Sequence, residues 1–408
     1  MTGYESKKYL LTIKTLTPLH IGSGSKLRED FDFFLHDGSV YFVNQGALYA
    51  LLLDNLIKKL GEEKAGQSIR QISGKKISEL IKFKHCSIDQ LVDPQNRVVR
   101  NRISADAFLD KGLSQRELSV LLKSVENEPY LPGSSIKGSL RSSFFRFLNP
   151  DKIEINYREN RGRYDSRVAD DILERKKFLA RQNVSWREFP HYDIWRGVQI
   201  TDTNTCKSDQ IKLACASVYP LKESQNLDLY LEVIPEETTF QASLTLDAWL
   251  FLEASNRGTQ QGHQTGYSEE HLKSFREMPA SIYEDSKELL RQEIRFIQHL
   301  QSEHRVDDFD QLRMTISHFD AIARMPVKPN EFITTMGFGT GWLAKTLGHH
   351  LQEQLSDEQF DEMVSRFELG RGNWKRNHVI PTTRMIVTTD TVERAPLGWV
   401  KVTMDEQL

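Results

Sequence analysis

Two glycine-rich turns, each followed by a predicted helix with basic residues, have the residue types and spacing of a phosphate-binding site. The first lies in the segment "LPGSSIKGSLRSSFFRF". Its candidate contacts are Gly133, Ser134, Ser135, Lys137 and Arg141. The first N–H groups of a helix attract anions, and cations four residues apart lie on one helix face. The turn therefore predicts a phosphate contact. The alternative is an ordinary helix that Ser134 or Ser135 caps, with solvated cations.

The second turn lies in "TTMGFGTGWLAKTLGHH". Gly337, Gly339 and Gly341 alternate with larger residues and precede a predicted helix that carries Lys345. Glycine allows a ligand to approach the backbone closely, so this turn is a second candidate for ligand binding. The alternative is a flexible hinge or a tight turn that packs a helix.

Three single side chains and one basic segment are further candidates. His20 follows a predicted strand in "TPLHIGSGSK", where a phosphate or base contact and a structural role have equal weight. Asp30 and Asp32 in "LREDFDFF" could bind a metal or move a proton, although solvated charges beside a strand are the more ordinary interpretation. "GRGNWKRNHVIPTTR" combines Trp374 with four basic residues and suits single-stranded nucleic acid, or is a solvated loop.

Composition excludes several classes of protein. The formal net charge of −3 argues against a protein that coats nucleic acid nonspecifically, but it leaves room for a local basic groove. Cys86, Cys206 and Cys215 are too few and too far apart for a disulfide framework or a thiolate zinc site. No cysteine or serine nucleophile motif occurs, and no metal or other cofactor is predicted. No stretch approaches the roughly 20 apolar residues of a membrane span, so we expect a cytoplasmic protein without membrane contact.

The elements that must position these residues begin with a predicted α+β unit, residues 1–148. "KKYLLTIKTLTPLHIG" alternates around β-branched residues, and "FDFFLHDGSVYFVN" is typical of a hairpin around Asp37-Gly38. "GALYALLLDNLIKKLG" has helical spacing and a C-cap at Gly61. Residues 82–110 are expected to leave the core as a loop or hairpin. The helix after the first glycine turn is expected to face the core with Ile136, Leu140, Phe144 and Phe147.

The remaining chain predicts a linker and a second unit. Residues 149–197 are polar and rich in arginine, which indicates a linker or an insertion. Strand patterns then resume, and amphipathic helices follow from about Glu269 to Arg324. Residues 198–408 therefore form a second predicted unit, with a helical insertion and the glycine-rich loop at 337–341. Because strands precede a glycine turn and a helix in both units, the pattern predicts two similar α+β domains.

Four segments, in this order, resemble the RAMP superfamily of CRISPR proteins: "TPLHIGSG", "YLPGSSIKGSLRSSF", "GFGTGWLAKT" and "PLGWVKV". The resemblance covers essentially the whole chain, with residues 149–330 contributing only loosely. Length, the spacing of the late glycine loop and the "LGWVK" ending are similar to the fifth-subunit family of the Csm complex, the type III-A effector.

This resemblance implies two RRM-like, ferredoxin-type domains, the first with its glycine turn at 132–138. It also implies a cytoplasmic antiviral defence role as an RNA-binding subunit that caps the 3′ end of the CRISPR RNA guide and the end of the backbone filament, and supports guide maturation. The implied partners are the guide, target RNA through the assembled complex, Csm backbone subunit three, Csm small subunit two and host nucleases that trim the guide. The segment "DPQNRVVRNR" would correspond to the thumb-like hairpin of backbone relatives.

The resemblance implies RNA contact but no catalytic residue. The RNA-binding positions carried over are His20, Gly133, Ser134, Ser135, Lys137, Arg141, Gly337, Gly339, Gly341 and Lys345. Ser139 stands where many relatives have alanine, and "IPTTRM" is less basic than the corresponding family stretch, which leaves RNA contact there open. Target cleavage in the family is credited to backbone subunits through a loop aspartate. A metal-dependent endoribonuclease that uses Asp30 and Asp32 is therefore the alternative function.

Overall fold

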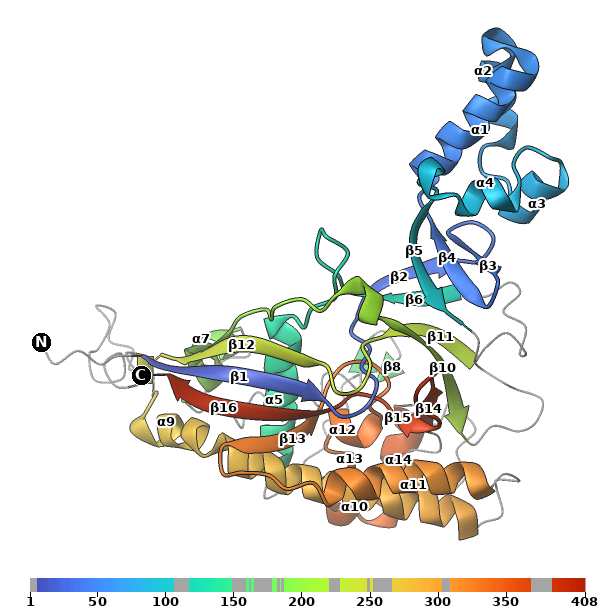
Figure 1. The fold of residues 1–408 in the computed structure, drawn as a ribbon. Helices are drawn as coiled ribbons and strands as arrows, with labels where there is room; N and C mark the ends of the chain where they lie inside the picture. Colours follow the sequence, from blue (N-terminus) through green and yellow to red (C-terminus); the bar gives the residue numbers. More distant parts are fainter. Residues whose placement is uncertain are drawn as a thin grey trace, which may run out of the picture.

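A computed structural model gives the fold of most of the chain. It describes residues 6–105, 117–148, 159–160, 163–164, 178–181, 184, 187–219, 228–247, 250–251, 266–302, 309–367 and 384–407. The fold is mixed α+β, as predicted, with two large sheets and a separate arm (Figure 1). None of the described helices is long and apolar enough to cross a membrane.

The first large sheet has five antiparallel strands. In spatial order they are β13 (Glu331–Thr335), β16 (Trp399–Gln407), β1 (Lys7–Thr15), β12 (Thr239–Leu246) and β9 (Val198–Ile200). Helix α5 (Gly133–Phe147) precedes β9 in the chain, and α9 (Glu269–Arg276) and α10 (Met278–Ser302) follow β12 and precede β13. Strand β12 lies between β1 and β9, and such a crossing over one antiparallel strand also occurs in ferredoxin-like folds.

Alternation along the strands gives this sheet a buried face. Residues at every second position of β1 and β12, such as Leu11, Ile13 and Phe240, are fully buried, whereas their neighbours are half-buried or exposed. Helices α5 and α10 pack together beside this sheet, and α10 also lies against β13. Burial of apolar side chains between sheet and helices therefore holds the helix that follows the first glycine turn.

The second large sheet has six strands and takes its strands from the whole length of the chain. In spatial order they are β15 (Ala395–Pro396), β14 (Arg384–Thr388), β10 (Lys212–Tyr219), β11 (Asp228–Val233), β6 (Glu117–Leu121) and β2 (Gly22–Arg28). The remaining helices of the C-terminal half are α11 (Phe309–Ala323), α12 (Trp342–Lys345), α13 (Gly348–Gln354) and α14 (Asp357–Arg366). Strand β2 lies at one edge of the sheet, so the residues after His20 form an edge strand.

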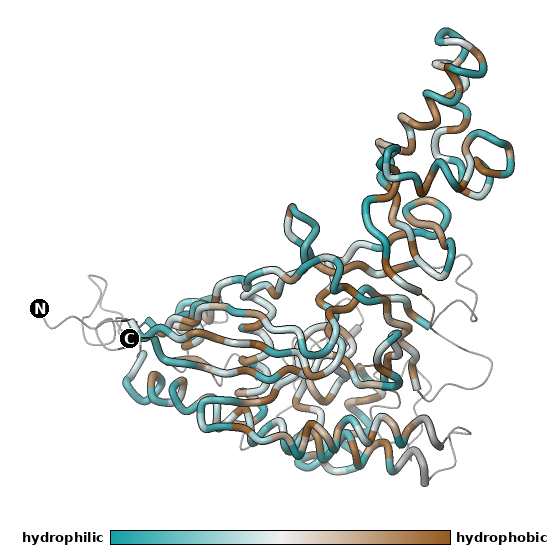
Figure 2. The backbone as a smooth tube through the Cα atoms, in the orientation of Figure 1, coloured by the Kyte–Doolittle hydropathy of each residue, from teal (hydrophilic) through white to brown (hydrophobic). Residues whose placement is uncertain are grey.

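An arm projects from the body between β2 and β6 (Figure 1). Its strands are β3 (Phe33–His36), β4 (Ser39–Val43) and β5 (Val99–Ser104), and its helices are α1 (Gln45–Leu60), α2 (Glu62–Ile72), α3 (Ile77–Lys82), α4 (Ile88–Val92) and η1 (Pro94–Asn96). The predicted hairpin and the helix that ends at Gly61 are confirmed. Of the predicted excursion, residues 82–110, the described residues 82–105 form only part of this arm, and residues 106–110 lie outside the described ranges. The arm has a hydrophobic cluster of its own, and Figure 2 shows hydrophobic and hydrophilic residues alternating along it.

Residues between the predicted domains also contribute to the core. Phe178 and Trp195 are fully buried in the main hydrophobic cluster. The short elements in and after this segment are β7 (Glu159–Asn160), β8 (Arg163–Tyr164), α7 (Phe189–Tyr192), η3 (Ile194–Gly197) and η4 (Ser208–Gln210). Each large sheet contains strands from both sides of residues 148 and 198. The division into two RRM-like domains at these residues stays a prediction.

Other sequence-based expectations have definite outcomes. The amphipathic helices predicted from about Glu269 to Arg324 are confirmed as α9, α10 and α11. The expectation for Phe147 is wrong: it lies in the last turn of α5 with an exposed ring, while Ile136, Leu140 and Phe144 are buried as expected. The three cysteines are buried and are not joined by disulfide bonds. Within the described ranges, no group of three or more His, Cys, Asp or Glu side chains could hold a metal ion.

Candidate nucleic-acid interface

Three segments that are far apart in the sequence meet beside the first strand. We call this meeting point the junction, and it consists of residues Thr17–Gly22, Met336–Gly341 and Leu397–Trp399. The Met336 N–H donates to the Gly398 carbonyl at 2.7 Å, and the Gly398 N–H donates to the Pro18 carbonyl at 2.9 Å. The Phe338 N–H donates to the His20 carbonyl at 2.8 Å. Backbone hydrogen bonds therefore join the late glycine loop to the turn at His20.

The late glycine loop turns sharply where it crosses His20. Gly337, Gly339 and Gly341 all have positive φ, between 79° and 92°. At Gly337 a Cβ atom would also lie 2.5 Å from the His20 carbonyl oxygen, which is much closer than real Cβ atoms approach. Only glycine combines the left-handed conformation with this close approach. The glycine pattern in the sequence is thus explained by the path of the loop over the turn.

Phe338 is the one residue of this loop with a large exposed side chain. Its side chain is 40% exposed although it is apolar. Its ring meets the His20 ring edge to face, with centroids 5.8 Å apart. Sequence analysis missed this residue. The available signal was an aromatic residue between two glycines, because neighbours without side chains cannot cover its ring.

His20 lies beneath the loop. Its side chain is 4% exposed, and its Nδ1 atom is 2.7 Å from the Glu232 carbonyl oxygen. Burial lowers the pKa of His20, although the hydrogen bond to Glu232 opposes this effect. A neutral ring that donates from Nδ1 supports Phe338 from below. In this geometry His20 positions the loop, and its direct contact with RNA stays a prediction.

The first glycine turn does not have the expected cap. The N-cap of α5 is Pro132, and no side chain caps the helix, so the expectation of a cap from Ser134 or Ser135 is wrong. Instead, the Gly133 N–H donates to the Asp202 carboxylate at 2.8 Å. Ser134 is exposed and Ser135 is half-buried. The protein therefore supplies its own anion for the first N–H of this helix.

The two cations of the first turn also have partners within the protein. Lys137 donates to the Val198 carbonyl at 2.7 Å, and burial lowers its pKa. Arg141 donates to both carboxylate oxygens of Asp193, at 2.7 and 3.0 Å, and its guanidinium lies 4.7 Å from the centroid of the Phe178 ring. These contacts attach α5 to the start of β9 and to the segment before it. RNA contact by Lys137 and Arg141 therefore stays a prediction.

The two glycine turns lie at opposite edges of the five-stranded sheet. Gly133 approaches Ile200 at the end of β9, whereas the late loop continues directly from β13. Four interstrand steps separate β9 from β13, or roughly 19 Å at the usual strand spacing.

The helix predicted after the late loop is broken into two: α12 ends at Lys345, which is exposed, and α13 begins at Gly348.

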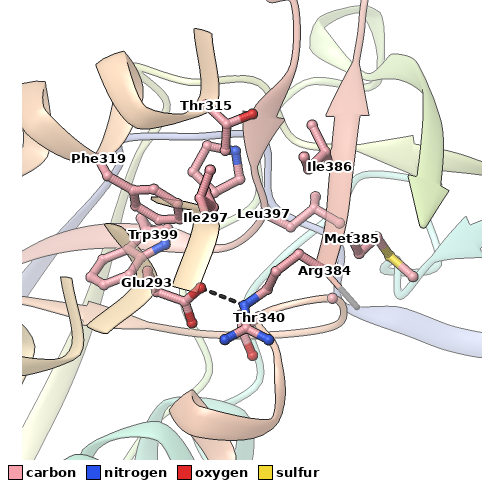
Figure 3. Close-up of a pocket in the computed structure, with 12 residues that line it drawn as sticks. Glu293, Ile297, Thr315, Phe319, Thr340, Arg384, Met385, Ile386, Leu397 and Trp399 are labelled. Carbon is pink, nitrogen blue, oxygen red and sulfur yellow. Dashed lines mark hydrogen bonds and ion pairs between the residues drawn. The ribbon is translucent and has the colours of Figure 1, made fainter. Parts of the chain in front are cut away.

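A buried ion pair lies under the late loop. Glu293 accepts a hydrogen bond from Nε of Arg384, and both side chains are buried in a pocket lined by Thr340, Phe319 and Trp399 (Figure 3). The pocket holds about 20 Å³, enough for a water molecule but not for a nucleotide. Arg384 is therefore not a surface cation of the predicted basic segment. The rest of that segment, with Trp374, lies outside the described residues.

The two candidate catalytic carboxylates serve as hydrogen-bond acceptors. Asp30 accepts from the Ser78 N–H at 2.8 Å and from the Ser78 hydroxyl, at the start of α3. Its own carbonyl accepts the Ile77 N–H at 2.8 Å. Asp32 accepts from the Arg28 N–H at 2.8 Å. Asp30 thus ties helix α3 of the arm to the loop after β2.

Replacing Asp30 with alanine is expected to lower the free energy of unfolding by about 0.5–2 kcal/mol, the usual effect of losing a capping side chain. Asp30 also has a positive φ of 68°, which alanine tolerates less well than aspartate or asparagine. Asp30→Asn keeps an acceptor oxygen and is the matched control. Chemical denaturation measures both variants. An unchanged midpoint for Asp30→Ala would show that the contact does not hold α3.

The RAMP superfamily matches residues 12–309, well over half of the chain. The chain belongs to the RAMP superfamily. This confirms the family predicted from the motifs, three of which meet in the junction.

Within the RAMP superfamily, the chain is similar to proteins named CRISPR system Cms protein Csm5. The Streptococcus thermophilus protein is 22% identical over 251 residues, which cover 59% of this chain and 64% of that protein. The chain thus matches less than two thirds of that relative's length. The Methanocaldococcus jannaschii protein is 22% identical over 410 residues, which cover 96% of this chain and 88% of that protein.

Two solved structures share the fold along almost the whole chain. A chain of the cryo-EM structure of a Csm–crRNA–target RNA ternary complex in a type III-A CRISPR-Cas system aligns with a TM-score of 0.59 and 18% identity. The alignment covers 98% of this chain and 100% of that chain. The crystal structure of T. onnurineus Csm5 aligns with a TM-score of 0.57 and 16% identity, covering 95% and 99% of the two chains.

Proposed function

We propose that this chain is the CRISPR RNA-binding subunit of a type III-A Csm effector complex. It caps the 3′ end of the guide and the end of the backbone filament, and it supports guide maturation. Its partners are the guide, target RNA through the assembled complex, backbone subunit three, small subunit two and the host nucleases that trim the guide. The observation that carries this proposal is the junction, where three motif segments converge and leave Phe338 exposed between two glycines.

The junction would bind RNA through its backbone and one aromatic ring. N–H groups of a glycine-rich loop can approach phosphate oxygens, and an exposed ring can stack on a base without reading its identity. Sequence specificity then belongs to the guide. Among the predicted contacts, Lys345 and Ser134 are exposed and available to phosphates. His20 would act through the loop, because its ring is covered.

We propose a noncatalytic role for this subunit. Asp30 and Asp32 accept backbone hydrogen bonds at the base of the arm, and this use of both carboxylates supports a structural role. The purified protein, mixed with a 3′ guide fragment in Mg²⁺, should leave the RNA intact and bind it less tightly as salt rises. Cleavage that Asp32→Ala abolishes would instead favour the endoribonuclease. Weak association that salt does not change would favour a protein scaffold.

Replacing Phe338 with alanine is expected to weaken binding of a 3′ guide fragment about 5- to 150-fold. This range corresponds to the roughly 1–3 kcal/mol that a base gains by stacking on an aromatic ring. Fluorescence anisotropy at fixed salt measures the change.

Phe338→Trp should keep the affinity because it keeps a stacking surface. Phe147→Ala removes an exposed ring of similar exposure outside the junction, so it is the matched control. Equal affinities of Phe338→Ala, Phe147→Ala and wild type would exclude stacking at the junction and remove the main support for the proposed function.

A further inference from the structure

The arm has a charge opposite to that of the rest of the chain. Residues 33–104, from the start of β3 to the end of β5, contain eleven Lys and Arg residues and seven Asp and Glu residues, a net charge of +4, although the whole chain has −3. The arm projects from the body (Figure 1), and its own hydrophobic cluster leaves its polar side chains on the outside. A basic surface that stands apart from an acidic body attracts polyanions locally.

The cations gather around one exposed aromatic ring at the end of α3. Phe83 is 56% exposed. The Lys75 ammonium lies 5.6 Å and the Lys82 ammonium 6.0 Å from the centroid of its ring. Lys84 is also exposed. Burial lowers the pKa of His85, and the positive charges of Lys75 and Lys59 lower it further.

The lysines of this surface do not stabilise the fold through ion pairs. Lys75, Lys82 and Lys84 make no ion pair with any residue that the structure describes. By contrast, surface lysines of the body such as Lys26 pair with a carboxylate. Helix α3 and the turn after it are held in place, because Ile77, Leu80 and Cys86 are buried and the start of α3 is hydrogen-bonded to Asp30.

We propose that this surface, formed by Phe83 with Lys75, Lys82 and the neighbouring Lys84, binds single-stranded RNA independently of base sequence. The lysines would contact successive phosphates while one base stacks on the Phe83 ring, a combination suited to single strands because every base has a π-face. An acidic protein segment would match the charges but not the exposed ring flanked by cations. This inference goes beyond the proposed guide-capping function, because it concerns a different surface.

The test uses the full chain and a twelve-nucleotide oligouridine as the probe, about the length that one such surface contacts. Phe83→Ala is expected to weaken binding about five- to 100-fold, and Phe83→Tyr should restore it. Lys75→Ala with Lys82→Ala should reduce the slope of log affinity against log salt by about 1.4, since each phosphate contact on a single strand contributes roughly 0.7. Tyr49→Ala, which removes another exposed ring of the arm, is the matched control.

The outcomes separate this proposal from the function of the junction. The oligouridine and a guide fragment should lose affinity equally in Phe83→Ala, because the surface reads no sequence. A loss of RNA affinity in Phe83→Ala but not in Phe338→Ala would support RNA binding by the arm and contradict RNA binding by the junction. A loss in Phe338→Ala but not in Phe83→Ala would overturn the proposal for the arm. Unchanged RNA binding by the double lysine variant, combined with failure to join the assembled complex, would make this surface a protein contact and also overturn the proposal.

Discussion

Arg146→Leu is expected to lower the free energy of unfolding by about 3–5 kcal/mol, the usual cost of leaving one member of a buried ion pair alone. Arg146 and Asp285 are both buried, and the guanidinium donates to both carboxylate oxygens, at 2.7 and 3.0 Å. Arg146 also donates to the Ser143 hydroxyl and to the carbonyl of Ala344 in α12. One side chain thus joins α5, α10 and the helix after the late loop.

The destabilisation by Arg146→Leu should shrink as the pH falls from 7 toward 4. Burial raises the pKa of Asp285 above its usual value, and Arg146 opposes this effect. Without Arg146 the pKa of the buried carboxyl rises further, so Asp285 is protonated at higher pH and no longer lacks a counter-charge. Since His350 also lowers the pKa of Asp285, wild type is measured at each pH as the reference.

Chemical denaturation measures these differences, and a double variant is the control. Arg146→Leu with Asp285→Leu removes both charges and should be less destabilised than Arg146→Leu alone. An equal loss in the single and double variants would mean that packing, and not the unpaired carboxylate, causes the effect.

Gly133→Ala is expected to be the second severe substitution. A Cβ atom at this position would lie 2.2 Å from the Ile200 carbonyl oxygen and 2.8 Å from that of Thr201. Both contacts are with backbone, so α5 must move away from β9. Overpacking of this kind costs about 1–3 kcal/mol. The movement also breaks the hydrogen bond to Asp202, and a bond to a charged acceptor contributes about 1.5–3 kcal/mol.

Gly138→Ala is the matched control for Gly133→Ala, because it makes the same change five residues later in the same helix. A Cβ atom at Gly138 would meet nothing within 4 Å. Alanine is favoured over glycine within a helix by about 0.5–1 kcal/mol, so the control should be stabilised. Thermal and chemical unfolding report opposite signs for the two variants. A loss of stability in both would show that general helix effects, and not the contact with β9, decide the outcome.

Local sequence patterns predicted individual helices and strands well, but they did not predict which other segments these helices and strands pack against. The hairpin at Asp37-Gly38, the helix ending at Gly61 and the buried positions Leu140 and Phe144 follow from turn chemistry and periodicity, which depend on near neighbours. Phe147 continues the same period but lies in the last turn of α5 and is exposed. Periodicity predicts which residues lie on one face of a helix. It does not predict how many of those residues a neighbouring element buries.

The candidate site depended on contacts between distant residues. Gly133 and the cations of the first turn have the pattern of an anion site, but their actual partners, Asp202, Val198 and Asp193, come from a segment that the sequence marked as linker or strand. A pattern of donors cannot reveal whether the protein supplies the acceptor. The same limit hid Phe338, whose importance comes from the meeting of three segments.

The place of β1 between β12 and β16 has a consequence for biosynthesis. Lys7 and Glu406, which form an ion pair across β1 and β16, are 399 residues apart in the sequence. While the ribosome is still translating, one edge of β1 has no partner, whereas the arm already contains everything that its cluster needs. Pairing at such separation is slow, and an unpaired strand edge promotes aggregation. The nascent chain should therefore fold its arm first and require chaperone protection of β1 until β16 has emerged.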